Sequence, residues 1–435
     1  MNRPFLSSYR HHLETGSTLR WSGRINQIVG NLIESDGPFC FVGESCQIIG
    51  DGGRCYSGEI VGFRASTMLS MAAEQPQGIR FGDRIVTWGA RPSVRVGPGM
   101  LGRVLDTAGN PLDGKGDYRA LHTVTIDGSA PLPLERIAIR EVLGCGIRAI
   151  DGFLTCGRGQ RIGIFGGSGV GKSTLIGMMA RGTAADMTVL ALVGERGREV
   201  GEFLEVLGEE GLRRAVVIVS TSDQSPLLRL RAALTATAVA EHFASLGKNV
   251  LLIVDSLTRF AMAQREIGLA AGEPPTAKGY TPSVLNMLAR LVERVGNFSQ
   301  GSITAFYTVL MEGDDQLDPV VDTVRSLLDG HVVLDRNLAL RSQYPPISIL
   351  ESISRLMSSM VSAEHLAKAN ALRLMLAAYA RSEDLIRIGA YQKGSDPVLD
   401  GAIQNLPALQ DCLMQKPDTL CTFDDAVAQL MALPS

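Results

Sequence analysis

Residues 161–179 read RIGIFGGSGVGKSTLIGMM, and this stretch decides the class of fold. An apolar strand comes first, a glycine-rich turn follows, and a helical pattern completes it. Gly166, Gly171, Lys172 and Ser173 stand in the GxxxxGK[ST] register. Glycine lets the backbone wrap closely around an anion, and the helix N-terminus then points its N–H groups at the negative charge. The stretch therefore predicts a phosphate-binding loop, the P-loop, between a strand and a helix.

The P-loop assigns a role to each kind of side chain in it. Lys172 is expected to reach the β- and γ-phosphates of a nucleotide, and the Ser173 hydroxyl is expected to ligate Mg²⁺. ATP and Mg²⁺ are thus the predicted cofactors. The residues predicted to contact the nucleotide are Gly166, Gly167, Ser168, Gly169, Val170, Gly171, Lys172, Ser173 and Thr174.

Continuous apolar runs around the P-loop alternate with helical patterns. Runs rich in Val, Ile and Leu without polar alternation are typical of parallel strands that are buried on both faces. They occupy residues 162–165, 189–193, 216–219, 250–254 and 303–309, and helical spacing follows at 284–295. The predicted fold is an α/β, RecA-like P-loop core with a parallel sheet.

Two acidic residues follow buried runs directly and are expected at the ligand-binding rim of that sheet. Asp255 ends LLIVD and is the candidate Mg²⁺ acid, although such an aspartate can also merely cap a helix. Glu195 follows TVLALVG and is the candidate general base, with Glu199 behind it. The alternative for both glutamates is simple pairing with Arg196 and Arg198.

The remaining chain divides by pattern into further regions. Residues 1–20 form a tail, and 21–90 carry short apolar runs broken by glycine, as in a small β-barrel. A Gly/Pro-rich linker is expected over 96–117, inside a P-loop domain placed at 91–358. Residues 359–435 look all-helical, with an apolar stripe at 366, 369, 372, 376 and 379 and a helix start at Asp396 and Pro397.

Composition excludes several classes of protein. The chain has 435 residues with 42 basic against 45 acidic side chains, a formal net charge of −3, which disfavours a uniformly basic nucleic-acid coat. Its seven cysteines form no CxxC pair and are expected to be reduced thiols. No apolar run approaches a signal peptide or a membrane span of about 18 residues. We therefore expect a cytoplasmic protein that binds no nucleic acid.

Four segments together resemble a known family: GGSGVGKST, GERGREV, VDSLTRFAMAQREIGLAAGEPP and GSITAFYTVLMEGDDQLDPVVDTVRSLLDGHVVLDR. They are similar to the type III secretion and flagellar export ATPases, which are relatives of the rotary ATP synthase catalytic subunit. The resemblance runs from about residue 22 to residue 396. It implies an ATP hydrolase of a protein export apparatus, and the segments 261–284 and 312–330 look closer to flagellar than to injectisome versions.

The resemblance also implies roles that the residues alone do not suggest. In YPPISILESISRLM, Tyr344 is similar to the aromatic residue that packs on adenine, and Arg355 matches the arginine finger that completes a neighbouring subunit's site. It further implies a ring-forming barrel, a homohexamer, and a position at the inner face of the cell membrane through peripheral association. The implied partners are a stator-like regulatory protein, a central stalk protein, export chaperones with their substrates, and the membrane export gate.

Two segments depart from the family pattern, and alternative functions are also compatible with a P-loop core. SQYPP replaces a histidine-tyrosine-proline-alanine sequence beside the adenine pocket, and LARLVER, residues 288–294, replaces a version with proline. The alternatives are an injectisome ATPase, a rotary synthase subunit, a Rho-like RNA translocase and a nucleotide-binding subunit without turnover. Aromatic residues make up only 5% of the chain, which disfavours the stacking surface of an RNA translocase.

Overall fold

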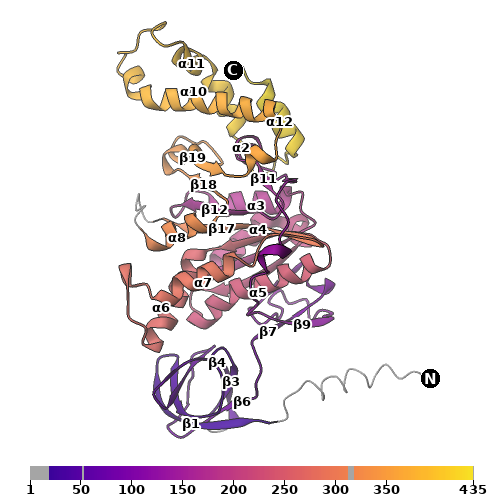
Figure 1. The fold of residues 1–435 in the computed structure, drawn as a ribbon, viewed down its shortest axis with the longest axis vertical. Coiled ribbons are helices and arrows are strands. Elements are labelled where there is room, and N and C mark those ends of the chain that lie inside the picture. Colours follow the sequence, from indigo (N-terminus) through magenta and orange to yellow (C-terminus); the bar gives the residue numbers. More distant parts are fainter. Residues whose placement is uncertain (1–18, 51–52, 312–317, 435) are drawn as a thin grey trace, which may run out of the picture.

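A barrel, a largely parallel sheet and a group of helices follow one another along the long axis of the computed structural model (Figure 1). The structure describes residues 19–50, 53–311 and 318–434. Most of the predicted tail, residues 1–18, lies outside the described residues, as do 312–317 within one of the segments that resemble flagellar versions. The predicted fold class is confirmed: a β-barrel precedes the P-loop sheet, and helices end the chain.

The barrel closes in the strand order β1-β2-β5-β4-β3-β6. Alternate side chains of its strands point inward, and Ile33, Ile48 and Ile60 are fully buried there. Short apolar runs broken by glycine predicted this barrel in the sequence, although none of those runs was assigned to β2 or β5. The strand bounds are β1 Trp21–Val29, β2 Leu32–Asp36, β3 Ser45–Ile49, β4 Cys55–Arg64, β5 Thr67–Ala72 and β6 Arg84–Thr87.

The prediction of a linker over residues 96–117 is wrong, because this segment packs into the core. Within it, β8 (Arg103–Leu105) pairs in parallel with β14 (Ala215–Thr221) at the edge of the main sheet. Arg103 donates to both carboxylate oxygens of Asp113, at 2.7 and 2.9 Å, and both side chains are buried. Glycine and proline therefore shape tight turns here and do not mark a flexible connection. Nearby, β7 (Ser93–Val96) pairs with β9 (His122–Thr125).

The main sheet has the strand order β19-β18-β12-β17-β15-β13-β14-β8. The strands from β18 to β8 run parallel, whereas β19 runs antiparallel to β18 and the short β16 (Asn297–Phe298) runs antiparallel to β17. Each of the five predicted buried runs lies within one of its strands. The remaining bounds are β12 Arg161–Gly166, β13 Met187–Glu195, β15 Asn249–Asp255, β17 Gly301–Leu310, β18 Gly330–Leu334 and β19 Ile347–Ser354.

Helices cover both faces of this sheet. Successive side chains of β13 point to opposite faces and so pack against different helices. Val189, Ala191 and Val193 pack in one core with α5 (Pro226–Ser245), α6 (Leu257–Ala271), α7 (Pro282–Val292) and α8 (Pro319–Leu327). Leu190 and Leu192 pack in the other core with α2 (Arg148–Phe153), α3 (Lys172–Gly182) and α4 (Gly197–Arg213). Two short elements, the pair of β10 (Val142–Leu143) with β11 (Cys156–Gly157) and helix α9 (Arg336–Leu340), complete this region.

Helix α7 ends three residues earlier than its apolar spacing predicted. Its last helical residue is Val292, and Glu293 caps it. Arg294 then turns inward, where it is 2% exposed and donates to both oxygens of Glu241, at 2.7 and 2.6 Å. The segment LARLVER thus completes the helix without proline and ends in two anchored charged side chains.

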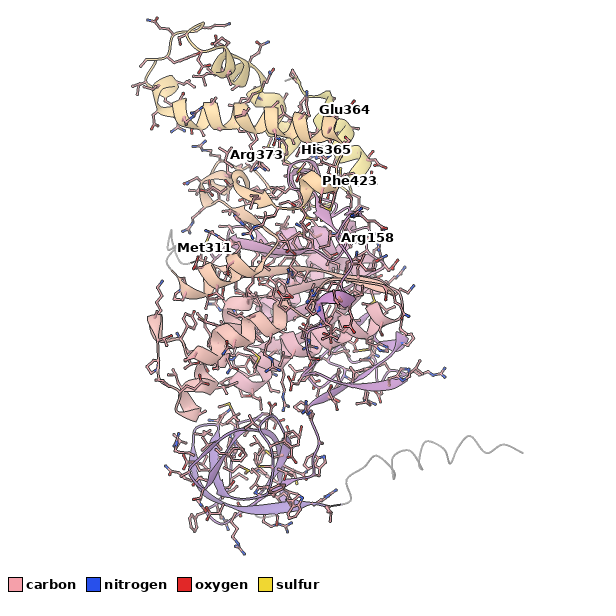
Figure 2. All side chains as sticks on the ribbon, viewed as in Figure 1. Arg158, Met311, Glu364, His365, Arg373 and Phe423 are labelled. Atoms are coloured by element: carbon pink, nitrogen blue, oxygen red, sulfur yellow. The ribbon has the colours of Figure 1, made fainter. Side chains whose placement is uncertain are left out.

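The C-terminal helices are α10 (Ala363–Arg387), α11 (Pro397–Leu413) and α12 (Phe423–Ala432). Asp396 caps α11 by accepting from the N–H groups of Val398 and Leu399, as predicted for a helix start there. The predicted apolar stripe lies on α10 and faces the core, since Ala369 and Leu372 are buried. His365 and Arg373 of α10 point toward the sheet (Figure 2) and bond to main-chain carbonyl groups of α2 and β19.

Candidate active site

The P-loop has the backbone shape that its glycines predicted. β12 ends at Gly166 and α3 begins at Lys172. Between them Gly169 and Gly171 have φ angles of +77° and +94°, which residues other than glycine adopt only with strain. A Cβ on Gly166 would also lie only 3.0 Å from the Cβ of Leu334. The loop therefore leaves its N–H groups and the N-terminus of α3 available to an anion.

Lys172 and Asp255 meet beside this loop. The Lys172 Nζ lies 2.8 Å from Asp255 Oδ1, and both side chains are largely buried. Asp255 ends β15, two strands from β12, and the hydroxyl of Thr308 on the intervening β17 donates to the same carboxylate at 2.7 Å. The lysine and the acid that the sequence assigned to one rim are thus in direct contact there.

Glu195 lies at the same rim, at the end of β13. Its Oε1 lies 3.2 Å from Nε of Arg259, and the Glu195 side chain is 12% exposed. Arg259 also donates from Nη1 to the carbonyl oxygen of Gly194, at 2.7 Å. The guanidinium therefore holds both the glutamate and the turn that precedes it.

The pKa of Glu195 is raised to about 7, and burial of this carboxyl group is the largest cause. The hydrogen bond to Glu199 and the negative charge of Asp255 raise this pKa further, while the charges of Arg259 and Lys172 lower it. The pKa of Glu199 is lowered, first of all by the same hydrogen bond. The opposite shifts of the two pKa values favour a proton on Glu195 over one on Glu199, and Glu195 is poised to exchange a proton near neutral pH.

The donors around Asp255 suit a magnesium ion bound together with phosphates. Mg²⁺ prefers oxygen ligands and usually takes only one or two from carboxylates, with water and substrate phosphates supplying the others. Asp255 offers a carboxylate, and Ser173 offers an exposed hydroxyl in the first turn of α3. Within the residues that the structure describes, no three or more His, Cys, Asp or Glu side chains gather as a metal site. The residues present therefore fit an ion that is held largely by the nucleotide.

Tyr344 lies next to the P-loop, between α9 and β19. A Cβ on Gly171 would lie 3.8 Å from two of its ring carbons, and the tyrosine is 49% exposed. Its carbonyl oxygen accepts from the N–H of Gln415, which follows α11. Within the replaced SQYPP segment, Gln343 is buried. An exposed ring beside the N-terminus of α3 is well placed to cover a nucleotide base.

Arg355 lies near the start of β12, at the end of the parallel strands opposite to the P-loop. Its N–H donates to the carbonyl oxygen of Asp329, whose own N–H donates to Arg161 at the start of β12. β12 then extends over about 16 Å to Gly166 at roughly 3.3 Å per residue. The Arg355 side chain is exposed and makes no ion pair with any residue in the described ranges. The structure therefore unites Lys172, Glu195, Asp255 and Tyr344 but separates them from Arg355.

The sequence did not reveal two residues that contact the acidic side chains of the site, Arg259 and Thr308. Arg259, which pairs with Glu195, lies in the first turn of α6, four residues after Asp255. The sequence places Arg259 close to Asp255, but only the alignment of β13 with β15 brings it to Glu195. Thr308 lies inside a continuous apolar run, and only the register of β17 beside β15 brings its hydroxyl to Asp255.

Together the P-loop, the lysine–aspartate contact and the second rim carboxylate define a P-loop nucleotide hydrolase. Residues 146–354 match the ATP synthase alpha/beta family, nucleotide-binding domain. Residues 361–432 match the T3SS EscN ATPase C-terminal domain.

Similar proteins cover almost the whole chain. The flagellum-specific ATP synthase of Bacillus subtilis is 50% identical over 97% of this chain and 97% of its own. The type 3 secretion system ATPase of Xanthomonas euvesicatoria is 45% identical over 98% and 97%. The assembled ATPase EscN of the enteropathogenic E. coli type III secretion system superposes with a TM-score of 0.89 at 42% identity, covering 94% of this chain and 98% of that one. The chain belongs to the family of flagellar and type III secretion ATPases, and it is an ATP-hydrolysing enzyme.

Proposed function

We propose that this chain hydrolyses Mg²⁺-bound ATP at the rim formed by β12, β13 and β15 and thereby serves a flagellar protein export apparatus. The contact between Lys172 and Asp255, with Glu195 on the next strand, is the observation that carries the assignment of the site. The proposed work of the enzyme is to release chaperones and deliver export substrates to the membrane gate.

Each residue of the rim has a distinct task in this proposal. The P-loop N–H groups and Lys172 bind the phosphates, so Lys172 exchanges its contact with Asp255 for the nucleotide. Asp255 and Ser173 would hold Mg²⁺, which neutralises phosphate charge when it is bound. Glu195 orients the attacking water and accepts its proton, and Glu199 sets how readily Glu195 does so. Tyr344 packs on the base.

The flagellar assignment has support from the relatives. Six flagellum-specific ATP synthases are 42% to 50% identical to this chain, two of them at 50%, against 45% and 46% for two type 3 secretion system ATPases. An injectisome ATPase is the second candidate. The match of residues 361–432 to a secretion ATPase C-terminal domain disfavours a rotary synthase subunit and a Rho-like translocase.

We further propose that the chain acts as a homohexamer with a central stalk protein. EscN has been solved in its assembled form and in complex with its central stalk EscO, and the second structure has a TM-score of 0.87 with this chain. The remote position of Arg355 favours the same arrangement, because this arginine can complete only a neighbouring subunit's site. A stator-like protein, export chaperones and the export gate remain further proposed partners.

The place in the cell and the division of the chain also belong to this proposal. Of the helices in the described ranges, none has the length and apolarity to cross a membrane. We propose a cytoplasmic enzyme that associates peripherally with the inner face of the membrane. Its proposed parts are a tail at 1–20, a ring-forming barrel at 21–90, a P-loop domain at 91–358 and a helical domain at 359–435.

Replacing Glu195 by Gln tests the site most simply. Glu195→Gln keeps the size of the side chain but removes the base, so we expect ATP binding to persist and turnover to fall by at least about 100-fold. Nucleotide affinity from fluorescence titration and phosphate release from ATP measure the two effects. The matched control is Glu202→Gln on α4, an exposed residue paired with Arg198, which should retain turnover. Normal hydrolysis by Glu195→Gln, or loss of ATP binding, contradicts the role assigned to Glu195.

A further inference from the structure

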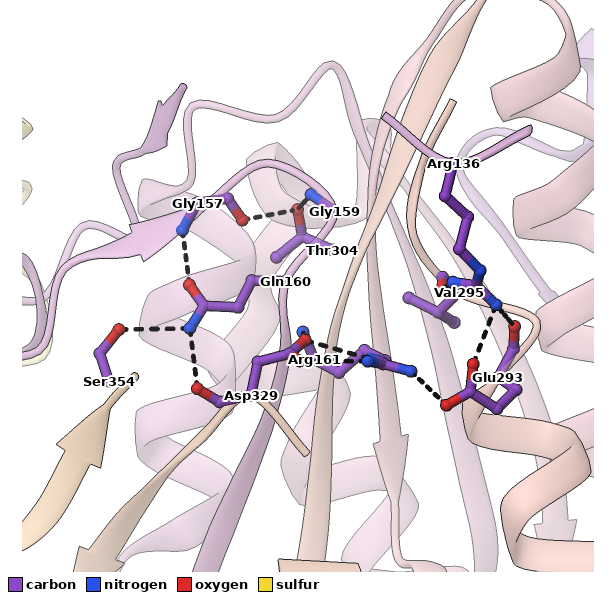
Figure 3. Close-up of polar contacts among 10 residues, drawn as sticks. All are labelled: Arg136, Gly157, Gly159, Gln160, Arg161, Glu293, Val295, Thr304, Asp329 and Ser354. Atoms are coloured by element: carbon purple, nitrogen blue, oxygen red, sulfur yellow. Dashed lines mark hydrogen bonds and ion pairs between the residues drawn. The ribbon is translucent and has the colours of Figure 1, made fainter. Parts of the chain in front are cut away.

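Gln160, immediately before β12, contacts Ser354 and Asp329 (Figure 3), and these two residues adjoin or bond to the backbone of Arg355. The amide of Gln160, which is completely buried, donates to Ser354 Oγ at 3.2 Å and to the carbonyl oxygen of Asp329 at 3.3 Å. The same carbonyl oxygen accepts the N–H of Arg355 at 3.0 Å. Ser354 Oγ in turn donates to the carbonyl oxygen of Thr155 at 2.9 Å. The main chain at Arg355 is therefore tied to buried groups while its side chain is exposed.

The carboxylate of Asp329 fixes this arrangement to the first residue of β12. Arg161 donates to it from its main-chain N at 3.0 Å, from Nε at 3.0 Å and from Nη2 at 3.1 Å. These partners compensate the desolvation of Arg161, whose pKa is raised above its ordinary value. A two-pronged contact between a planar guanidinium and a carboxylate restricts orientation as well as distance.

The charges continue from Arg161 to the end of α7. Arg161 Nη1 lies 2.6 Å from Glu293 Oε1, and Glu293 Oε2 lies 3.0 Å from Nη2 of Arg136. Positive and negative groups thus alternate along a row of four side chains, with Asp329 at the end nearest Arg355. Asp329 connects the row to Arg355 through a single hydrogen bond, which its own main-chain carbonyl accepts.

We propose that Asp329, held by Arg161 and backed by Gln160, is a positioning residue that aims Arg355 at the neighbouring subunit's nucleotide. This inference rests on the proposed role of Arg355 in trans. The reach of an arginine finger depends on the direction in which its main chain presents it, and a misplacement of about 1 Å can lower a rate on the order of 100-fold. Because the same strand β12 leads into the subunit's own P-loop, the contacts join the finger of one site to the phosphate loop of the next.

A double-mutant cycle on turnover tests this role. Asp329→Asn keeps the side-chain volume but weakens the paired contact with Arg161, and we expect kcat to fall on the order of tenfold while ATP affinity of the isolated subunit is unchanged. Arg355→Ala should lower kcat on the order of 1,000-fold. If Asp329 acts through Arg355, adding Asp329→Asn to Arg355→Ala should change kcat by less than about twofold.

A matched control and a second variant make the outcome decisive. Glu141→Gln breaks an exposed ion pair with Arg158, also near the start of β12 but without contact to Arg355, and should leave kcat unchanged. Ser354→Ala removes the hydroxyl that Gln160 contacts and serves in the same cycle if Asp329→Asn does not fold. An equal loss of kcat from Asp329→Asn in both backgrounds overturns the positioning role alone. Full activity of Arg355→Ala overturns the finger itself, and the positioning role with it.

Discussion

Burial and neighbouring charges give Glu195 a pKa that suits its proposed role as a base. Its pKa of about 7 results from burial, from Glu199 and from Asp255, while Arg259 and Lys172 oppose the rise. In the free enzyme, protonated Glu195 cannot accept a proton from water, so kcat/KM should rise with pH and reach half its maximum near pH 7. This is the direction expected for a base that works as the carboxylate.

Two substitutions should move this midpoint in opposite directions. Arg259→Gln removes a positive charge that lowers the pKa of Glu195, so the midpoint should shift to higher pH. Glu199→Gln removes the ionised acceptor that favours protonated Glu195, so the midpoint should shift to lower pH. Phosphate-release assays across pH at fixed concentrations of free Mg²⁺ and ATP measure both shifts. Equal midpoints in the three proteins would show that Glu195 does not set the profile.

At the scale of residues, local spacing predicted positions but not partners. Lys172 and Asp255 each follow from their place after an apolar run, and the structure joins them at 2.8 Å. Thr308 could not be foreseen, because its hydroxyl meets Asp255 only through the pairing of two strands that are distant in sequence. The pairing of Arg259 with Glu195 depends in the same way on how β13 and β15 align.

Among the elements, helix α5 connects the barrel to the sheet. Ser225 caps its first turn by accepting the N–H of Leu228, and its hydroxyl donates to the carbonyl oxygen of Ala73, which follows strand β5 of the barrel, at 2.6 Å. Arg231, on the same helix, pairs with Glu59 of β4 at 2.7 Å. One helix therefore carries several polar contacts between the two regions.

Ser225→Ala should destabilise the protein by about 2 kcal/mol, since it removes a helix cap and leaves a buried carbonyl without its donor. The shift of the urea unfolding midpoint measures this loss. Ser245→Ala, at the exposed end of the same helix, removes a hydroxyl that donates only within its own turn, and should change stability by less than about 0.5 kcal/mol. Equal shifts for the two variants would contradict the bridging role of Ser225.

The sequence predicted long strands and helices better than their ends and the segments that connect them. Runs of Val, Ile and Leu located the central strands because burial on both faces leaves that composition. The segment at 96–117 was misjudged because glycine and proline are equally typical of tight packed turns, and here they frame the edge strand β8. α7 ends at Val292, not at 295, since the inward turn of Arg294 toward Glu241 outweighs the apolar spacing.

In the whole molecule, Arg355 is separated from the P-loop of its own subunit. A single subunit presents Lys172, Glu195 and Asp255 at the carboxyl ends of the parallel strands and Arg355 near their opposite ends. In the proposed ring, a complete site therefore needs two subunits, one contributing the rim and the other Arg355. Such a ring makes hydrolysis depend on contacts between neighbours.

Mixing two inactive variants tests whether each ATPase site is shared between two subunits. Lys172→Ala lacks a working rim but keeps Arg355, and Arg355→Ala lacks the finger but keeps the rim. When the two are mixed at concentrations that form rings, interfaces that combine an intact rim with an intact finger should restore a measurable part of the ATPase activity, because neither defect lies in those sites. Mixed rings that form, as verified by differently labelled subunits, yet show no more activity than either variant alone would contradict a site shared between subunits.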